Sequence, residues 1–368
     1  MIALMSEEEL AQYGPVILPA DMASVRDPGC HNCEGYRPEP QRSGNLQVDP
    51  EIHLPSPGMD VDISYYYNAA ATNNGPFGYG RQLSTNLTAQ ANGTHPIVTL
   101  TRANGAVASY QDDGSGAFNA KTPGLLNTLA KDVGNSLWKE TTPDGHVTAY
   151  PLDTTGQVTS LSFRQDAVGN VQTLSYSAGL LQTIEDAVGR LVSFSYSSGL
   201  LSSIQDWAGR RTTFQYDTAS ASPMNLLTTV IGPTGCQTQY GYTTFHLAGA
   251  TSDWLLSSIV DPNGFATSYL YDQQRRVTSR SIAGAAPWTY LYQPGFMLTM
   301  DPLGNITTQT LGSNYSLGGV KFPTGQGDDI TRDAITLQQT SLQNGLGAVW
   351  TTLYDGSGNV IGTQDPLG

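Results

Sequence analysis

Two cysteines near the start of the chain have a spacing that could bind a metal or form a redox pair. Cys30 and Cys33 form a CxxC motif with a histidine inside it. A closed zinc site needs four ligands, and a thioredoxin-like CxxC lies at a strand-to-helix junction of a βαβ unit, which nothing here resembles. The other cysteine and histidines occur singly, at Cys236, His53, His95, His146 and His246. We therefore expect a local disulfide or free thiols at Cys30 and Cys33 rather than zinc, and no cofactor.

Five aspartates recur in the second half of the chain and could serve in acid–base catalysis. They are Asp166, Asp186, Asp206, Asp261 and Asp301, each three residues before a glycine. On an antiparallel ribbon, successive copies would lie two strands, about 10 Å, apart, whereas a retaining glycosidase pair needs about 5 Å and an inverting pair up to about 9.5 Å. Capping of a type I turn by the aspartate side chain explains all five. We therefore expect structural aspartates and no enzyme, with a glycosidase as the least favoured alternative.

The aspartates belong to a repeat of about twenty residues. Its four-residue turns are Asp166–Gly169, Asp186–Gly189, Asp206–Gly209, Gly232–Gly235, Asp261–Gly264, Asp301–Gly304 and Asp365–Gly368. Ten residues after the start of a turn stands a tyrosine, with an aromatic or large apolar residue usually two positions earlier, which is the period of a strand. These tyrosines are Tyr176, Tyr196, Tyr216, Tyr242, Tyr271 and Tyr354. Each repeat is therefore predicted to be two short strands and two turns, stacked on its neighbours.

The pairs Tyr216-Asp217, Tyr271-Asp272 and Tyr354-Asp355, each with a glycine-containing turn upstream, resemble the YD repeat of the Rhs (rearrangement hotspot) family. Similar repeats occur in bacterial insecticidal toxin shells and in teneurins. The resemblance covers residues 153 to 368 and extends more weakly upstream. It implies a strip of sheet that spirals into a hollow cocoon and encloses or presents something else.

Composition and the recurring turn residues indicate an all-β chain in three parts. The last part is an antiparallel ribbon of stacked hairpins, and two other segments precede it. We expect an irregular arm at residues 1–43, a β-rich cap at 44–165 and the repeat strip at 166–368. The formal charge of −14, without any basic run, argues against nucleic acid as a partner. No apolar stretch is long enough for a membrane span, and the first residues lack the pattern of a secretory signal. We expect a bacterial, extracellular or cell-surface protein exported by another route.

The leading functional hypothesis is a non-catalytic structural strip, a subunit or fragment of a shell, fibre or surface assembly. Its partners would be further copies in an oligomer or fibre, or downstream repeats of the same gene product. The alternative is a carbohydrate- or protein-binding module. Two insertions, near residues 218–224 and 244–253, fall in the same class of turn and would project from one edge of the strip. The residues that we expect to build such a surface are Tyr242, His246, Trp254 and Trp207.

Overall fold

The computed structural model describes residues 38–48, 50–92, 96–122, 124–217, 224–245, 253–312, 315–356 and 358–368. All regular structure in these ranges is β-sheet, without a helix, so the predicted all-β class is confirmed. Cys30, Cys33 and His246 lie outside the described residues, as does most of the predicted arm. Among the residues described, there is accordingly no helix with the length and apolarity that crossing a bilayer requires.

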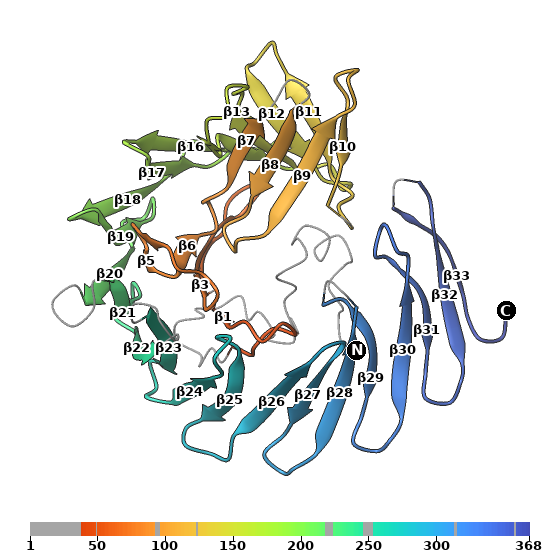
Figure 1. Cartoon of the computed structure of the whole chain (residues 1–368). Coiled ribbons are helices and arrows are strands. Elements are labelled where there is room, and N and C mark those ends of the chain that lie inside the picture. The colour runs from red at the N-terminus through yellow and green to blue at the C-terminus, as the bar shows by residue number, and fades with distance from the viewer. Residues whose placement is uncertain are drawn as a thin grey trace.

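One antiparallel sheet of 27 strands makes up most of the molecule, and strand follows strand round a curve (Figure 1). Its first part comprises β7 (Thr88–Asn92), β8 (Ile97–Thr101), β9 (Val107–Asp112), β10 (Phe118–Ala120), β11 (Thr128–Asp132), β12 (Leu137–Thr141), β13 (Val147–Pro151), β14 (Thr159–Ser160) and β15 (Phe163–Gln165). The repeat region comprises β16 (Val171–Ser177), β17 (Leu180–Glu185), β18 (Leu191–Ser197), β19 (Leu200–Gln205), β20 (Arg211–Asp217), β21 (Leu226–Ile231), β22 (Gln237–Phe245), β23 (Asp253–Val260), β24 (Ala266–Tyr271), β25 (Val277–Ile282), β26 (Trp288–Gln293), β27 (Phe296–Met300), β28 (Ile306–Leu311), β29 (Leu317–Lys321), β30 (Gly327–Arg332), β31 (Gln339–Gln343), β32 (Val349–Tyr354) and β33 (Val360–Gln364).

The sheet runs without a break through the predicted boundary between cap and strip, because β15 pairs with β16. At its far end the sheet stays open: within the described part of the chain, β33 pairs only with β32. A loop contact joins the early and late strands instead. The backbone N–H of Gly124, between β10 and β11, donates to the carbonyl oxygen of Ile335 in the turn after β30, at 3.0 Å. The curve is thus held by a contact between turns.

Each repeat is a hairpin with two kinds of turn. Strands β16 and β17 are joined by Ala178 and Gly179, both at positive φ (49° and 77°), as a two-residue type I′ turn requires. Strands β17 and β18 are joined by the turn that starts at Asp186, in which Gly189 adopts φ 82° and its N–H donates to the Asp186 carbonyl at 3.0 Å. These local turns set the alternation of strands that the sequence predicts.

A β-bulge recurs in the hairpins, and a tyrosine hydroxyl from the next repeat donates a hydrogen bond to a carbonyl oxygen at the bulge. In the first hairpin the register shifts beside Tyr176, which pairs with Leu181. The hydroxyl of Tyr196, fifteen residues after Leu181, donates to the Leu181 carbonyl oxygen at 2.9 Å. The same fifteen-residue bond joins Tyr242 to Leu227, Tyr271 to Leu256, Tyr292 to Val277 and Tyr354 to Gln339. A carbonyl that the bulge takes out of the ladder is satisfied by the following repeat.

Two irregular repeats support this account. Position 332 carries arginine instead of tyrosine, and the Arg332 Nε donates to the Leu317 carbonyl, again fifteen residues upstream, at 3.0 Å. The hairpin of β26 and β27 keeps a regular register without a bulge, and the residue fifteen positions after Phe296 is Leu311, which has no hydroxyl. In these two repeats the donor is present at a bulge and absent where there is none. The exception is the bulge at Leu201, because the Tyr216 hydroxyl, fifteen residues later, makes no hydrogen bond in the described structure.

We expect Tyr271→Phe to lower the free energy of unfolding by about 1–3 kcal/mol, because it leaves the buried Leu256 carbonyl without its donor. The matched control is Tyr216→Phe at the equivalent position, since the Tyr216 hydroxyl has no hydrogen-bond partner in the described structure. Chemical denaturation of both variants tests the difference. Equal losses in the two variants would contradict the role of the hydroxyl.

The concave face of the sheet is filled by the chain's own N-terminal segment, residues 38–84 (Figure 1). Its strands are β1 (Gln47–Val48), β2 (Glu51–Leu54), β3 (Val61–Asn68), β4 (Asn74–Gly75), β5 (Gly78–Tyr79) and β6 (Arg81–Leu83). Bulge residues of the sheet hold this segment through their N–H groups. The N–H of Val277 donates to the Gly44 carbonyl at 2.8 Å, that of Leu201 to the Pro76 carbonyl at 2.8 Å, and that of Leu256 to the Tyr67 hydroxyl at 2.9 Å.

Between the sheet and this segment lies one apolar core. The residues two positions before five of the six repeat tyrosines are buried, as their spacing predicts: Leu174, Phe194, Phe214, Tyr240 and Tyr269. Phe214 packs edge-on against Tyr65 of β3, with ring centroids 5.4 Å apart. The tyrosine ladder therefore belongs to the packed interior over the strands that the segment covers.

Candidate functional site

The repeated aspartates act within their turns. The Asp186 carboxylate accepts hydrogen bonds from the backbone N–H groups of Val188 (3.0 Å) and Arg190 (2.8 Å), and it pairs with the Arg190 guanidinium at 2.6 Å. Burial alone would raise the pKa of Asp186, but the Arg190 N–H and guanidinium lower it. In the exposed turn at Asp166, the Asn170 side-chain amide does most to lower the pKa. The carboxylates of Asp166 and Asp186 are thus held ionised as turn caps, each an acceptor rather than a proton donor.

We expect Asp261→Ala to lower the free energy of unfolding by about 0.5–2 kcal/mol, because its carboxylate accepts from the N–H groups of Asn263 and Phe265, both at 2.9 Å. Asp261→Asn keeps a side-chain acceptor and should lose less. Thermal melting measures both. A loss of ligand binding in Asp261→Ala without a change in melting temperature would contradict a purely structural role.

Three of the residues predicted to form a binding edge lie in the described structure, and Tyr242 and Trp254 are on the paired strands β22 and β23. Trp207 sits in the turn between β19 and β20, with the Arg190 guanidinium 3.7 Å from its ring centroid. Trp254 is half-buried on β23, opposite Thr244. The Tyr242 hydroxyl donates to the Leu227 carbonyl and accepts from Arg81, and its ring packs near Tyr67, so this residue is engaged in the interior. The inserted segments at 218–223 and 246–252, and His246 with them, lie outside the described residues.

A polar cavity of about 330 Å³ lies where the N-terminal segment meets the first part of the sheet. Two of the lining residues form an ion pair, in which the Arg102 guanidinium lies 2.5 Å from the buried Glu140 carboxylate. The same carboxylate oxygen accepts from the Tyr110 hydroxyl (2.7 Å) and the Asn127 amide (3.1 Å). Burial would raise the pKa of Glu140, but the Arg102 guanidinium and these hydrogen bonds keep it below its ordinary value. Glu140 is therefore a fixed anion whose Oε1 atom accepts from Arg102, Tyr110 and Asn127.

Arg164 of β15 and Tyr66 of β3 also line the cavity, as do Glu51 and Asp62. Arg164 makes one hydrogen bond to the described part of the chain, from Nη2 to the Ser84 carbonyl at 2.8 Å, and no ion pair there. Burial, together with the nearby Arg102 charge, lowers the pKa of Arg164, but an arginine stays charged in a protein. Positively and negatively charged side chains thus line one cavity.

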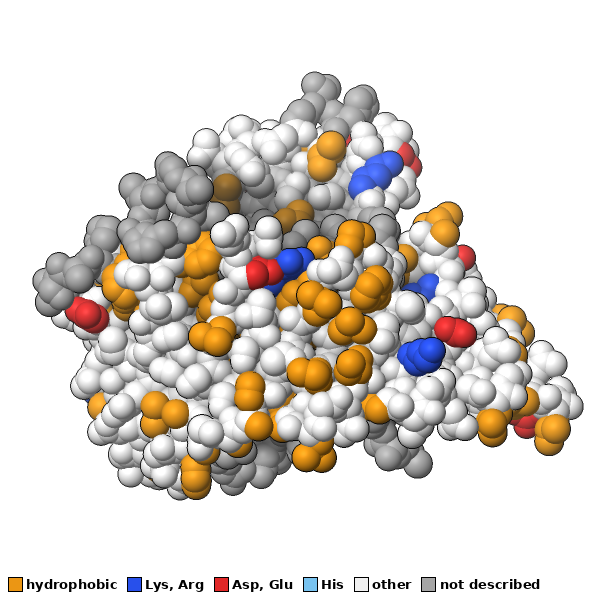
Figure 2. All heavy atoms as spheres, turned by 60° about the horizontal axis from the view of Figure 1, so that its bottom comes forward, with side chains coloured by type: hydrophobic (Ala, Val, Ile, Leu, Met, Phe, Trp, Pro, Cys, Tyr) orange, Lys and Arg blue, Asp and Glu red, His pale blue; other side chains and the backbone are white. Residues whose placement is uncertain are grey.

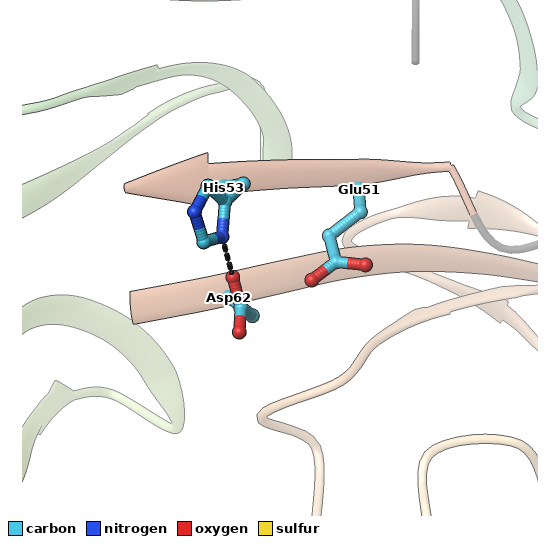
Figure 3. A group of neighbouring side chains, drawn as sticks. All are labelled: Glu51, His53 and Asp62. Atoms are coloured by element: carbon cyan, nitrogen blue, oxygen red, sulfur yellow. Dashed lines mark hydrogen bonds and ion pairs between the residues drawn. The ribbon is translucent and has the colours of Figure 1, made fainter. Parts of the chain in front are cut away.

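At the rim of this cavity, Glu51, His53 and Asp62 lie together on β2 and β3 (Figure 3). His53 and Asp62 are cross-strand partners, with Nδ1 and the carboxylate oxygen 2.6 Å apart. One ligand atom from each of the three residues lies within 4.8 Å of the others, a donor set that a divalent transition metal would accept once His53 is deprotonated. Pairing across the hairpin also accounts for the arrangement.

The hydrogen bond to Asp62 raises the pKa of His53, opposed by burial and supported by the charges of Asp60 and Glu51. A raised pKa means that the folded chain favours protonated His53. Its contribution to stability is therefore complete below the ordinary histidine value of about 6.5 and is lost as pH rises through the higher folded value. We expect the NMR titration of His53 to give a pKa above the ordinary histidine value of about 6.5, and Asp62→Asn to lower it. An unchanged value in Asp62→Asn would contradict the assignment.

Sequence reasoning did not find the cavity. Its charged residues come from β2, β3, β12, β15 and the turn after β8, and none belongs to a motif. No local spacing links Arg102 to Glu140 or Glu51 to Arg164. The only available signal was the presence of arginine and glutamate in a charge-poor chain.

Comparisons with known proteins give fold-level similarity of low score. No family model matches the chain, and no curated protein matches it. Among solved structures, the crystal structure of TcdB2-TccC3 without its hypervariable C-terminal region is 11% identical with a TM-score of 0.29, over 72% of this chain and 20% of that one. The TcdB2-TccC3-Cdc42 crystal structure is 9% identical with a TM-score of 0.31, over 89% and 23%. A Tc holotoxin pore from Photorhabdus luminescens is 13% identical with a TM-score of 0.23, over 74% and 19%.

The chain thus spans about a fifth of the length of these proteins. At such identities and TM-scores, its function has to be argued from its own residues.

Proposed function

We propose that the chain is a non-catalytic structural module of the YD-repeat type, a length of curved wall in an extracellular shell, fibre or surface assembly. The observation that carries this proposal is the enclosed segment: the concave face of the sheet binds residues 38–84 through the N–H groups of its bulges. A wall built this way can enclose extended chain of varied sequence, because backbone carbonyls of the enclosed segment accept most of these bonds.

Exposed apolar side chains on the outer face support association with further copies or further repeats. Leu291, Met300 and Ile306 are exposed on β26, β27 and β28, and Met300 pairs with Ile306 across the sheet. Figure 2 shows hydrophobic side chains spread among uncharged ones on this side of the molecule, with few charged groups. A surface poor in charge opposes association weakly.

Sedimentation over a concentration series, with electron microscopy, tests the assembly. We expect oligomers or fibres, and slower amide hydrogen exchange in residues 360–364 as they form, because β33 is paired on one side only within the described chain. Leu291→Lys should weaken association. Gln215→Lys, at an exposed position of β20, should not. A monomer at tens of micromolar with full amide protection in residues 360–364 would contradict the proposal.

The absence of catalysis is tested separately. We expect no hydrolysis when the chain is incubated with a panel of polysaccharides. Hydrolysis that disappears in Asp186→Asn or Asp206→Asn would show that the turn carboxylates are catalytic and would overturn this part of the proposal.

A further inference from the structure

The concave face of the sheet is buried over its first repeats and partly open over its last strands. In the first five repeats, the position four residues before the tyrosine is buried: Gln172, Val192, Thr212, Thr238 and Thr267. Trp350 occupies that position in the last repeat and is 40% exposed, although β32 is paired with a strand on each side. Pairing within the sheet therefore does not bury this position, and a covering segment is needed.

The residue that pairs with the tyrosine at each bulge gives the same comparison. It is buried in the first five repeats: Leu181, Leu201, Leu227, Leu256 and Val277. Its equivalent in the last repeat, Val360, is 57% exposed. Half-buried Leu342 of β31 pairs with Trp350 and with Ile330 of β30, so apolar side chains continue across these strands. The described residues thus leave an apolar part of the concave face in contact with water.

The described N-terminal segment begins at the border of this open part. The Glu39 carboxylate pairs with the Arg280 guanidinium of β25 at 2.6 Å. The Arg42 Nε donates to the Gln309 side chain of β28 at 3.3 Å. The chain that precedes residue 38 is therefore joined to the segment between the covered strands and the open ones.

Residues 1–37 are long enough and apolar enough to cover the open strands. This length of extended chain spans up to roughly 120 Å, whereas β28 and β33 lie about 24 Å apart along the sheet. Its sequence contains apolar runs at 1–5 and 16–18. Because these residues are tethered beside the open strands, their effective concentration there is on the order of millimolar, above that of a second copy at micromolar concentration.

We propose that residues 1–37 cover the concave face of β28–β33 and place apolar side chains against Leu342 and Trp350. The inference rests on the proposed function, because it treats the concave face as a surface that holds extended chain, and it names that chain for the last strands. The concave face would then be occupied by this chain itself. The outer face and the edge of β33 would remain for association.

Thiol cross-linking of the full chain tests this placement, because Cys30 and Cys33 provide native thiols in the segment. Leu342→Cys adds a thiol on the concave face of β31, and Ser341→Cys is the matched control, since neighbouring residues of a strand point to opposite faces. After reduction, each variant is treated with a short bifunctional maleimide at low micromolar protein concentration, and mass spectrometry identifies the links. We expect links within one chain from position 342 to Cys30 or Cys33, at least about tenfold more abundant than from position 341.

The inference is overturned if positions 341 and 342 react equally, if the links from position 342 join two chains, or if neither position links to Cys30 or Cys33. Sedimentation of the same sample separates this result from the assembly. A monomer that forms the links within one chain would contradict assembly alone. Oligomers without those links would contradict this inference alone.

Hydrogen exchange gives a second measurement that needs no added thiol. Ile17→Asp should speed amide exchange in residues 349–354 roughly tenfold, because it removes an apolar side chain from the segment that covers Trp350. Gln12→Glu, a polar-to-charged change in the same segment, should leave that exchange unchanged. Circular dichroism confirms folding of each variant, and if Leu342→Cys fails to fold, this comparison decides. Equal exchange in the two variants would overturn the inference.

Discussion

Phe214→Ala is expected to lower the free energy of unfolding by about 3–5 kcal/mol, because it opens a cavity in a packed core. Phe214 is 5% exposed, and its ring meets Tyr65 of the N-terminal segment edge-on at 5.4 Å. The loss therefore includes a contact between two parts of the chain that are far apart in sequence. Chemical denaturation, followed by tryptophan fluorescence, measures the change.

The control for this prediction is Leu270→Ala on the outer face of β24, where the side chain is 66% exposed. It should change stability little, because most of its surface is in water in both states. Hydrogen exchange adds a second readout: in Phe214→Ala, protection should fall in residues 61–68 as well as in β20. If only β20 loses protection, the N-terminal segment does not depend on this contact.

Glu140→Gln is expected to be as costly, about 3–5 kcal/mol, because it leaves the Arg102 guanidinium without its counter-charge in a buried site. Glutamine is nearly isosteric and keeps one acceptor, so the effect reports charge more than volume. Thermal and chemical denaturation at neutral pH measure it.

Two variants make this result specific. Asp132→Asn removes a carboxylate from the half-buried pair with Lys139 on the neighbouring strand and should have a smaller effect, because both side chains keep access to water. Replacement of both partners, Arg102→Met with Glu140→Leu, should cost much less than the sum of the single changes. Additive losses in the double variant would show that the two groups are not coupled.

The repeat could be predicted from sequence because its determinants are local. The aspartate and glycine of each turn lie within four residues, and the alternation toward Tyr196 or Tyr271 is the period of a single strand. Short-range sterics and hydrogen bonding decide such features wherever the segment lies in the molecule. The all-β class and the burial of Phe194 and Phe214 follow from the same pattern.

The partner of each tyrosine hydroxyl was within reach of the sequence but not recognised. Leu181 and Tyr196 are separated by fifteen residues, as are Leu256 and Tyr271, so the spacing is visible in the chain. Its meaning requires the bulge, because only a shifted register leaves a carbonyl for the next repeat to satisfy. Pairing register is a property of two strands together.

The amino-acid sequence by itself determined the unit: two strands, two turns, an apolar face and capped aspartates, repeated along the chain. Only the tertiary structure decided that residues 38–84 fill the concave face and that Arg164 shares a cavity with Glu51 and Asp62. The physical reason is the distance along the chain over which each kind of interaction acts. Turns and strand alternation arise from interactions between near neighbours, whereas the curvature accumulated over many strands brings together side chains that no spacing in the sequence relates.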